Sequence, residues 1–278
     1  MQTRAALVQL NASDDPSANL PVTQGFLREA ALGGAQFVLT PEVTNCLSSS
    51  RRHQQEVLQH QDEDLTLKGL RETAAELGIW LLIGSLALKT GDPDGRFANR
   101  SFLIAPDGSL KAWYDKIHMF DVQVTPTETY RESDGYRPGT RAVTAETPFG
   151  KLGLTICYDV RFPYLHRKLA DDGATILTAP AAFSPVTGAA HWEPLLRARA
   201  IENTAYVLAP GQCGSHDSHN GKLRKTHGHS IAISPWGEVL AEAGDEPCVT
   251  FVDLDTSAVE EARRKVPSLT HTREFQDP

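Results

Sequence analysis

Two apolar segments in different halves of the chain end in the same way. Residues 37–40 (Phe-Val-Leu-Thr) run into Pro41, and residues 175–179 (Thr-Ile-Leu-Thr-Ala) run into Pro180. Short apolar runs bounded by turn residues are typical of buried strands, and proline cannot continue the hydrogen bonding of such a strand. The shared ending indicates a two-fold pseudo-repeat, in which each half of the chain contributes a buried strand.

Helical segments alternate with the strands. Asp15-Pro16 supplies an N-cap and a first-turn proline for a helix to about residue 32, and apolar residues recur at helical spacing in residues 64–77. Two more helices are predicted near residues 164–171 and 191–203. The predicted strands cover residues 5–9, 37–40, 79–88, 99–104, 110–114, 152–156, 175–178, 206–209, 230–234, 238–241 and 249–253. This alternation predicts an α/β layered fold that binds ligands at the carboxyl ends of its strands.

Length and charge limit the possible partners. The 278 residues allow one or two domains, and we interpret the chain as a single domain covering residues 1–278. Charged residues make up 22% of the chain and the formal net charge is −8, with no basic block. These properties disfavour nucleic acid or an anionic membrane as a partner. They do not exclude an anionic substrate, because a local Arg or Lys can bind it.

The sequence contains no recognisable export or membrane segment. Residues 1–10 enter a strand directly, without the apolar core and cleavage site of a signal peptide. The longest apolar run, residues 79–88, is interrupted by Gly84 and Ser85 and is far shorter than the roughly 20 residues that span a bilayer. We therefore expect a soluble, cytoplasmic protein.

One cysteine stands at an abrupt end of a strand. Cys157 follows the strand at 152–156 and precedes a helix led by Pro163. Such an elbow presents a side chain above the sheet, beside backbone N–H groups that can stabilise an oxyanion, which suits a nucleophile. The alternative is a buried, inert thiol, which is common for cysteine. The spacing of all four cysteines indicates neither disulfides nor a zinc site: Cys46, Cys157, Cys213 and Cys248.

Two charged residues follow other strands. Glu42 is the first charge after the strand that ends at Pro41, and Lys116 follows the strand at 110–114. Taken singly, each is also compatible with an ordinary solvated charge. Together with Cys157 they could provide a base, a cation and a nucleophile at one edge of the sheets.

The three segments resemble a known family when they are taken together. Pro-Glu at 41–42, Asp-Lys-Ile-His at 115–118 and Ile-Cys-Tyr-Asp-x-Arg-Phe-Pro at 156–163 match, in order and approximate spacing, the Glu-Lys-Cys triad of the nitrilase, or carbon–nitrogen hydrolase, superfamily. The resemblance covers nearly the whole chain. It implies a four-layer α-β-β-α sandwich, a small-molecule amide substrate, and a homodimer or larger homo-oligomer. Residues 264–278 are then an extended tail that packs on a partner subunit.

The resemblance also implies roles for individual residues. Glu42 would take the Cys157 proton and return it to the leaving nitrogen, while Lys116 and the Tyr158 N–H would stabilise the oxyanion. A second carboxylate is expected in the loop after the lysine. Glu132 is our candidate for it and Glu128 is the alternative, although by composition alone either is an ordinary loop carboxylate.

Two further residues are candidates for binding the substrate. Arg161, four residues after Cys157, could hold a substrate carboxylate with two parallel hydrogen bonds. The alternative is a helix-end arginine paired with a structural acid such as Asp159. Thr187 lies in a second predicted wall of the pocket, residues 183–191, and could donate a hydrogen bond to substrate.

Several substrates remain open within the superfamily. Nitriles, carbamoyl amino acids and amides of α-keto acids compete, and the segments around 118–122, 131–133, 190–193 and 228–230 are most similar to the last group. That group contains deaminated-glutathione amidases and ω-amidases for α-ketoglutaramate or α-ketosuccinamate. Residues 198–202 and 212–216 are more similar to the first branch. The loop at 215–225 is longer than expected for that branch, so the sequence does not decide the leaving-group side of the pocket. A catalytically silent binding protein of the same fold is a hypothesis from another class.

A histidine cluster raises the question of a metal. His216, His219, His227 and His229 lie within fourteen residues, but no carboxylate or cysteine stands at ligand spacing among them. We expect no metal and no cofactor. The segment is predicted to be a flexible loop at the rim of the pocket.

Overall fold

Two six-stranded sheets of matching topology form the centre of the protein. The computed structural model describes residues 2–126, 128–219 and 224–276. The first sheet has the order β16 (Cys248–Asp255), β1 (Gln2–Gln9), β2 (Phe37–Leu39), β3 (Trp80–Lys89), β4 (Phe97–Ile104) and β5 (Leu110–Asp115). The second has the order β15 (Val239–Glu242), β14 (Ile231–Ile233), β11 (Tyr206–Ala209), β10 (Ile176–Thr178), β9 (Gly150–Leu154) and β8 (Val143–Thr147).

The pairing pattern bears out the pseudo-repeat. Strands β1, β2 and β3 are parallel in the first sheet, and β9, β10 and β11 are parallel in the second. In each sheet one antiparallel strand flanks the parallel trio on one side and two flank it on the other. The central strands β2 and β10 are therefore equivalent, and they are the two strands that run into Pro41 and Pro180.

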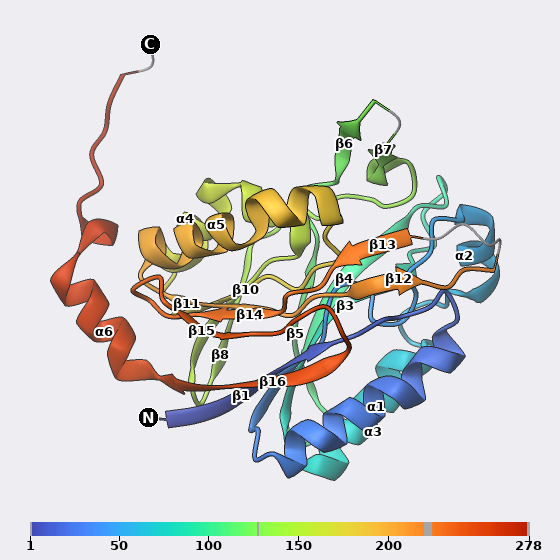
Figure 1. Cartoon of the computed structure of the whole chain (residues 1–278), viewed down its shortest axis with the longest axis horizontal. Coiled ribbons are helices and arrows are strands. Elements are labelled where there is room, and N and C mark those ends of the chain that lie inside the picture. Colours follow the sequence, from blue (N-terminus) through green and yellow to red (C-terminus); the bar gives the residue numbers. More distant parts are fainter. Residues whose placement is uncertain (1, 127, 220–223, 277–278) are drawn as a thin grey trace.

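Four helices complete the sandwich. α1 (Pro16–Leu32) and α3 (Leu65–Leu77) cover the outer face of the first sheet, and α4 (Pro163–Asp171) and α5 (Pro185–Asn203) cover the second (Figure 1). The predicted four-layer α-β-β-α fold is confirmed. The Asp15 side chain accepts hydrogen bonds from the first turn of α1, and the Asp64 side chain caps α3 in the same way. α5 begins six residues before the predicted start at His191, because Pro185 occupies its first turn.

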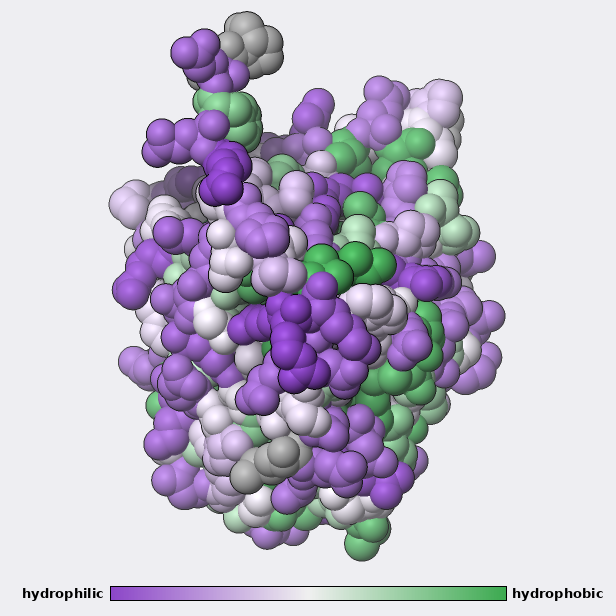
Figure 2. Space-filling view, turned by 90° about the vertical axis from the view of Figure 1, so that its left-hand side faces the viewer, coloured by the Kyte–Doolittle hydropathy of each residue, from purple (hydrophilic) through white to green (hydrophobic). Residues whose placement is uncertain are grey.

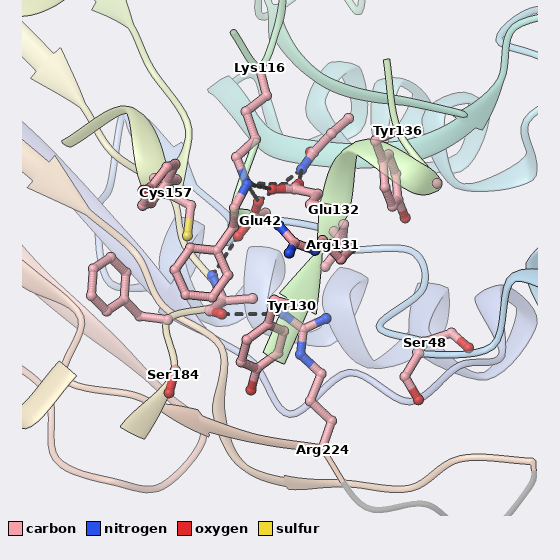
Figure 3. Close-up of a pocket in the computed structure, with 18 of the residues that line it drawn as sticks. Glu42, Ser48, Lys116, Tyr130, Arg131, Glu132, Tyr136, Cys157, Ser184 and Arg224 are labelled. Carbon is pink, nitrogen blue, oxygen red and sulfur yellow. Dashed lines mark hydrogen bonds and ion pairs between the residues drawn. The ribbon is translucent and has the colours of Figure 1, made fainter. Parts of the chain in front are cut away.

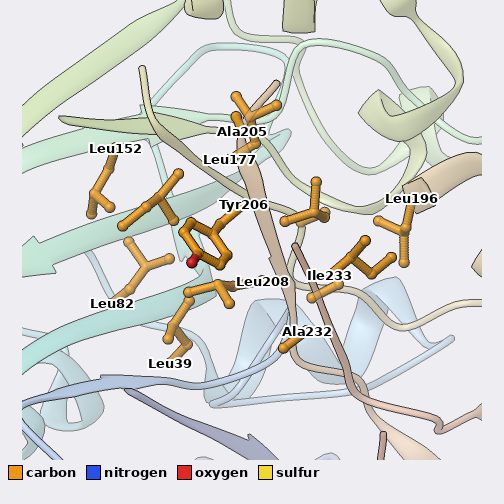
Figure 4. Packing of buried hydrophobic residues seen from close by; sticks show 14 of the residues in the cluster. Leu39, Leu82, Leu152, Leu177, Leu196, Ala205, Tyr206, Leu208, Ala232 and Ile233 are labelled. Atoms are coloured by element: carbon orange, nitrogen blue, oxygen red, sulfur yellow. The ribbon is translucent and has the colours of Figure 1, made fainter. Parts of the chain in front are cut away.

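Alternation along the strands separates two hydrophobic cores. Leu7, Leu39 and Leu82 point from the first sheet toward the second, and Figure 4 shows Leu39 and Leu82 against Tyr206 and Leu208. Their neighbours point to the other face, where they pack on α1 and α3: Ala6, Val8, Val38, Leu81 and Ile83. Because successive side chains of a strand point to opposite faces, each strand contributes residues to both hydrophobic cores.

Several elements were not predicted from the sequence. They are α2 (Arg51–Val57), α6 (Thr256–Lys265), β8 and two short hairpins, β6 (Asp121–Thr125) with β7 (Glu128–Arg131) and β12 (Cys213–His216) with β13 (Arg224–His227). The prediction of a flexible histidine-rich loop is wrong at both ends, because residues 213–216 and 224–227 pair in an antiparallel ladder. Residues 220–223 of that loop lie outside the described ranges.

The C-terminal tail is shorter than predicted. Residues 264 and 265 belong to α6, whose last turn contains three basic residues that favour a helix C-terminus. Beyond it, the chain extends away from the body, and Phe275 is 89% exposed. Figure 2 shows the face of the protein on which α6 and the tail lie. Hydrophilic residues cover most of this face, and apolar residues form smaller groups on it. None of the helices in the described part of the chain is long and apolar enough to cross a membrane.

Candidate active site

Glu42 lies where the equivalent strand ends of the two sheets meet. The residue is 4% exposed, and its Oε2 accepts a hydrogen bond of 2.8 Å from the N–H of Ala182, two residues after Pro180. The Glu42 carbonyl accepts a bond of 3.0 Å from the Gln212 side chain. Gly84 permits this approach, because a Cβ there would lie 2.0 Å from the Thr40 carbonyl oxygen and 2.6 Å from Pro180.

Cys157 begins a 3₁₀ turn (Cys157–Arg161) directly after the strand region of β9. Its φ of +49° lies in the left-handed region, which a non-glycine residue adopts at a cost of about 1–3 kcal/mol. The Cys157 N–H donates a 2.9 Å bond to the Pro180 carbonyl, which fixes the elbow. Cys157 is 7% exposed, and its sulfur points toward Glu42 (Figure 3).

Lys116 lies between two carboxylates. Its Nζ donates to Glu42 Oε1 at 2.9 Å and to both carboxylate oxygens of Glu132 at 2.8 Å. Glu132 stands at the start of a 3₁₀ turn after β7, and its Oε2 also accepts from the Phe120 N–H at 2.6 Å. The structure thus brings together Glu42, Lys116, Cys157 and Glu132. Glu128 begins β7, and its side chain lies outside the described part of the structure.

The electrostatics favour an ionised Glu42 and a protonated Cys157. Burial would raise the pKa of Glu42, but the Lys116 ammonium and hydrogen bonds from Lys116, Cys157 and Asn99 hold it below its ordinary value. Burial and the Glu42 charge raise the pKa of the Cys157 thiol well above its ordinary value, against a smaller opposing effect of Lys116. Burial lowers the pKa of Lys116, yet the charges of Glu132, Glu42 and Cys157 raise it overall. The thiol therefore faces a base rather than existing as a preformed thiolate.

Asn99 is a site residue that the sequence analysis missed. It lies within β4, is 2% exposed, and donates from Nδ2 to Glu42 Oε1 at 2.8 Å and more weakly to Glu132 at 3.5 Å. Its Oδ1 is buried without a partner among the described atoms. A polar residue in the middle of an apolar strand was the available signal, because buried polar groups normally require a specific reason.

Glu42, Asn99, Lys116 and Cys157 form the floor of a cavity of about 850 Å³, which Glu132 also lines. Tyr158 and Thr187, for which a substrate-binding role stays a prediction, line the cavity, and the Thr187 hydroxyl lies 3.4 Å from the Ser184 carbonyl. Arg161 does not line this cavity. Its guanidinium lies 5.4 Å from the ring centroid of Phe183 and 5.8 Å from that of Tyr158, and it approaches His191 Nδ1 at 3.3 Å.

One interpretation of the sequence paired Arg161 with Asp159, but the structure gives Asp159 other partners. It is fully buried, and its carboxylate accepts from Tyr114 Oη at 2.7 Å, the Ile156 N–H at 2.9 Å and the His118 N–H at 3.0 Å. These bonds join the segment after Lys116 to the segment before Cys157.

The cysteines and histidines away from Cys157 form no metal-binding group in the part of the chain that the structure describes. Within the described residues no cluster of three or more His, Cys, Asp or Glu side chains could hold an ion. Cys46 lines the cavity but burial raises its pKa to about 12, and His216 is buried between the Ala12 carbonyl and the Thr226 hydroxyl.

Comparison with known proteins places this geometry in context. The carbon–nitrogen hydrolase family model matches residues 4–264. A deaminated glutathione amidase of Yersinia enterocolitica is 39% identical over 269 residues, which cover 96% of this chain and 92% of that protein. The human omega-amidase NIT2 is 37% identical over 270 residues, covering 97% and 95%. The crystal structure of the Caenorhabditis elegans NitFhit protein superposes with a TM-score of 0.89 at 33% identity; the match covers 98% of this chain and 65% of that one.

Proposed function

Because this chain belongs to the carbon–nitrogen hydrolase family, we propose that it hydrolyses an amide through a thioester on Cys157. The observation that carries this proposal is the position of Lys116, whose ammonium contacts Glu42 and Glu132 beside the Cys157 thiol. A nucleophile, its base and an oxyanion donor then lie within one hydrogen-bonded network.

In the first half-reaction, Sγ of Cys157 attacks the amide carbon as Glu42 takes the thiol proton. The tetrahedral oxyanion is stabilised by Lys116 and by the Tyr158 N–H, which belongs to the first turn of a 3₁₀ segment and needs no helical acceptor. The C–N bond then breaks, Glu42 gives its proton to the leaving nitrogen, and the amine departs. The acyl group stays on sulfur as a thioester.

In the second half-reaction, Glu42 takes a proton from water, which attacks the thioester carbon. The C–S bond breaks, the carboxylic acid leaves, and Glu42 returns the proton to sulfur. The Ala182 N–H and Asn99 hold the Glu42 carboxylate in one orientation throughout. Glu132 keeps Lys116 in place and could accept a hydrogen bond from the substrate amide.

We propose deaminated glutathione as the substrate, which would yield 2-oxoglutarate and cysteinylglycine. The protein from Yersinia carries that name, and a cavity of about 850 Å³ provides more space than α-ketoglutaramate requires. Arg161, which lies outside the cavity but beside the lining rings of Tyr158 and Phe183, is then the candidate for the α-keto carboxylate. Thr187 is the candidate for a hydrogen bond to the acyl part. An ω-amidase that acts on α-ketoglutaramate is the second candidate, supported by the similarity to the human protein.

The proposal is tested with four purified substrates: deaminated glutathione, α-ketoglutaramate, a carbamoyl amino acid and a simple nitrile. We expect kcat/KM to be highest for deaminated glutathione and activity to disappear in Cys157→Ala. Equal or higher kcat/KM for α-ketoglutaramate would favour the ω-amidase. Binding of these amides without turnover by the unmodified protein would favour a silent binding protein.

We further propose a homodimer or larger homo-oligomer in which the tail after α6 contacts a partner subunit. An 89% exposed Phe275 on an extended segment supports this, because a large isolated aromatic side chain gains free energy when it is buried. Light scattering on the full chain and on a chain ending at residue 265 tests it. An unchanged mass in the truncated protein would remove the tail from the interface.

A further inference from the structure

One cationic residue of the cavity wall has no role in the chemistry proposed above. Arg224 begins β13, is half-buried, and lines the same cavity as Cys157. Within the described ranges it makes no ion pair with a carboxylate, and its Nη2 lies 3.4 Å from the Ala182 carbonyl. Arg51, another cation of the wall, instead donates to two backbone carbonyls, those of Asp134 at 2.6 Å and Asp94 at 3.0 Å.

The position of Arg224 is tied to the candidate base through a single residue. The Ala182 N–H binds Glu42, and the Ala182 carbonyl lies next to the Arg224 guanidinium. Covalent geometry within one residue therefore limits the distance between the Glu42 carboxylate and the Arg224 guanidinium to about 10 Å. Figure 3 shows Arg224 extending into the cavity on the side away from Cys157.

We propose that Arg224 forms a subsite for a carboxylate on the leaving group. This inference rests on the proposed function, in which Glu42 protonates the leaving nitrogen, so that the leaving amine lies on the Glu42 side. Arg131, from β7, lines the same cavity and adds a second positive charge. A guanidinium binds a carboxylate through two parallel hydrogen bonds, and a half-buried site weakens competition from water.

The distance between the Glu42 carboxylate and the Arg224 guanidinium limits the chemical class of the leaving group. Of the limit of about 10 Å, a hydrogen bond of about 3 Å at each end leaves about 4 Å between the leaving nitrogen and the carboxylate, a separation that one residue, or a dipeptide in a bent conformation, provides. Ammonia, by contrast, has no carboxylate for Arg224 to bind. The geometry therefore favours amides whose leaving amine is an amino acid or a bent dipeptide with a free carboxylate over amides that release ammonia.

A binding experiment tests this subsite without turnover. In the Cys157→Ala background, calorimetry compares deaminated glutathione with the same molecule carrying a C-terminal amide. We expect the free acid to bind about tenfold to a hundredfold more tightly, and Arg224→Gln to remove the difference. Arg224→Lys should retain part of it, and Arg52→Gln, an exposed charge on α2 outside the cavity, should retain all of it.

Turnover distinguishes this subsite from a general effect on the enzyme. In the otherwise unmodified chain, Arg224→Gln should lower kcat/KM for deaminated glutathione by a similar factor and leave α-ketoglutaramate unchanged. Equal binding of acid and amide, a difference that persists in Arg224→Gln, or equal losses on both substrates would each overturn the subsite. Absence of turnover by the unmodified enzyme would instead refute the proposed function, while the calorimetric comparison would still decide the role of Arg224.

Discussion

The floor and the outer wall of the cavity are built differently. The floor consists of Glu42, Asn99, Lys116 and Cys157, which follow or belong to strands of the two large sheets, are nearly inaccessible, and are hydrogen-bonded to one another or to backbone. The outer wall includes the hairpins β6–β7 and β12–β13, whose Arg131 and Arg224 are exposed or half-buried.

This difference indicates that the floor serves the reaction and the outer wall serves substrate selectivity. A buried, mutually bonded network holds its groups in one geometry, which a reaction common to all amides requires. Short hairpins outside the core can change without disturbing that network, because loops tolerate variation better than the elements they connect. Changes on the floor should therefore affect every substrate, whereas changes at the periphery of the cavity should alter selectivity.

The largest effect is expected at the nucleophile. Cys157→Ala should lower turnover of every substrate by at least about a thousandfold, because no other group on the floor can form the thioester. Alkylation of Cys157 should have the same result. Rates are measured for deaminated glutathione and α-ketoglutaramate, with circular dichroism as a control for folding. Unchanged kinetics in this variant would rule out the mechanism.

The second-largest effect is expected for Lys116→Gln. Loss of one oxyanion donor costs about a hundredfold to a thousandfold in kcat. The variant also leaves the buried Glu42 and the partly buried Glu132 without their cation, so the free energy of unfolding should fall by about 3–5 kcal/mol. Pre-steady-state kinetics and thermal unfolding measure the two effects. A change confined to KM would show that Lys116 only binds substrate.

Arg161→Lys should change selectivity rather than the chemical step. Loss of the two-pronged geometry should weaken substrates with an α-keto carboxylate by about tenfold, while an uncharged amide is hydrolysed as before. The measurement is the ratio of kcat/KM for the two substrate types. Equal losses would mean that Arg161 supports the turn after Cys157 through its contacts with Tyr158 and Phe183.

The smallest effect concerns pH. The pKa of Glu42 is held below its ordinary value of 4.5, so the base stays ionised as pH falls and kcat/KM should decline only below that value. The associated stabilisation is present above the unfolded-state pKa and is lost as pH falls through the lower folded-state pKa. The raised pKa of Cys157 predicts no rise in alkylation rate near pH 9. A rate that rises with a midpoint near pH 8–9 would indicate an ordinary free thiol.

The sequence predicted the floor better than the outer wall, and the reason is physical. Glu42, Lys116 and Cys157 each follow a strand whose apolar run and turn residues are visible locally, and the family resemblance grouped them. Asn99 was missed because a polar residue inside a strand reads as part of that strand until its partners are known.

The outer wall could not be predicted because its hairpins leave a weak local pattern. Segments such as 213–216 and 224–227 are short and polar, and their pairing depends on the Leu10 and Phe183 regions that lie far away in sequence. The choice between Glu132 and Glu128, and the direction in which Arg161 points, likewise depend on contacts across the fold. Local propensity carries no information about such contacts.

The pairing of β1 with β16 has a consequence for how the protein is made. β1 lies between β2 and β16, with Gln2 opposite Asp255 and Gln9 opposite Cys248, so its two partners come from opposite ends of the sheet's sequence. Until residue 255 has been synthesised, one edge of β1 has no partner, although Pro41 and Glu42 at the end of β2 have long been available. An unpaired strand edge can pair with other chains. A nascent chain that stalls before residue 248 therefore exposes an aggregation-prone edge on β1.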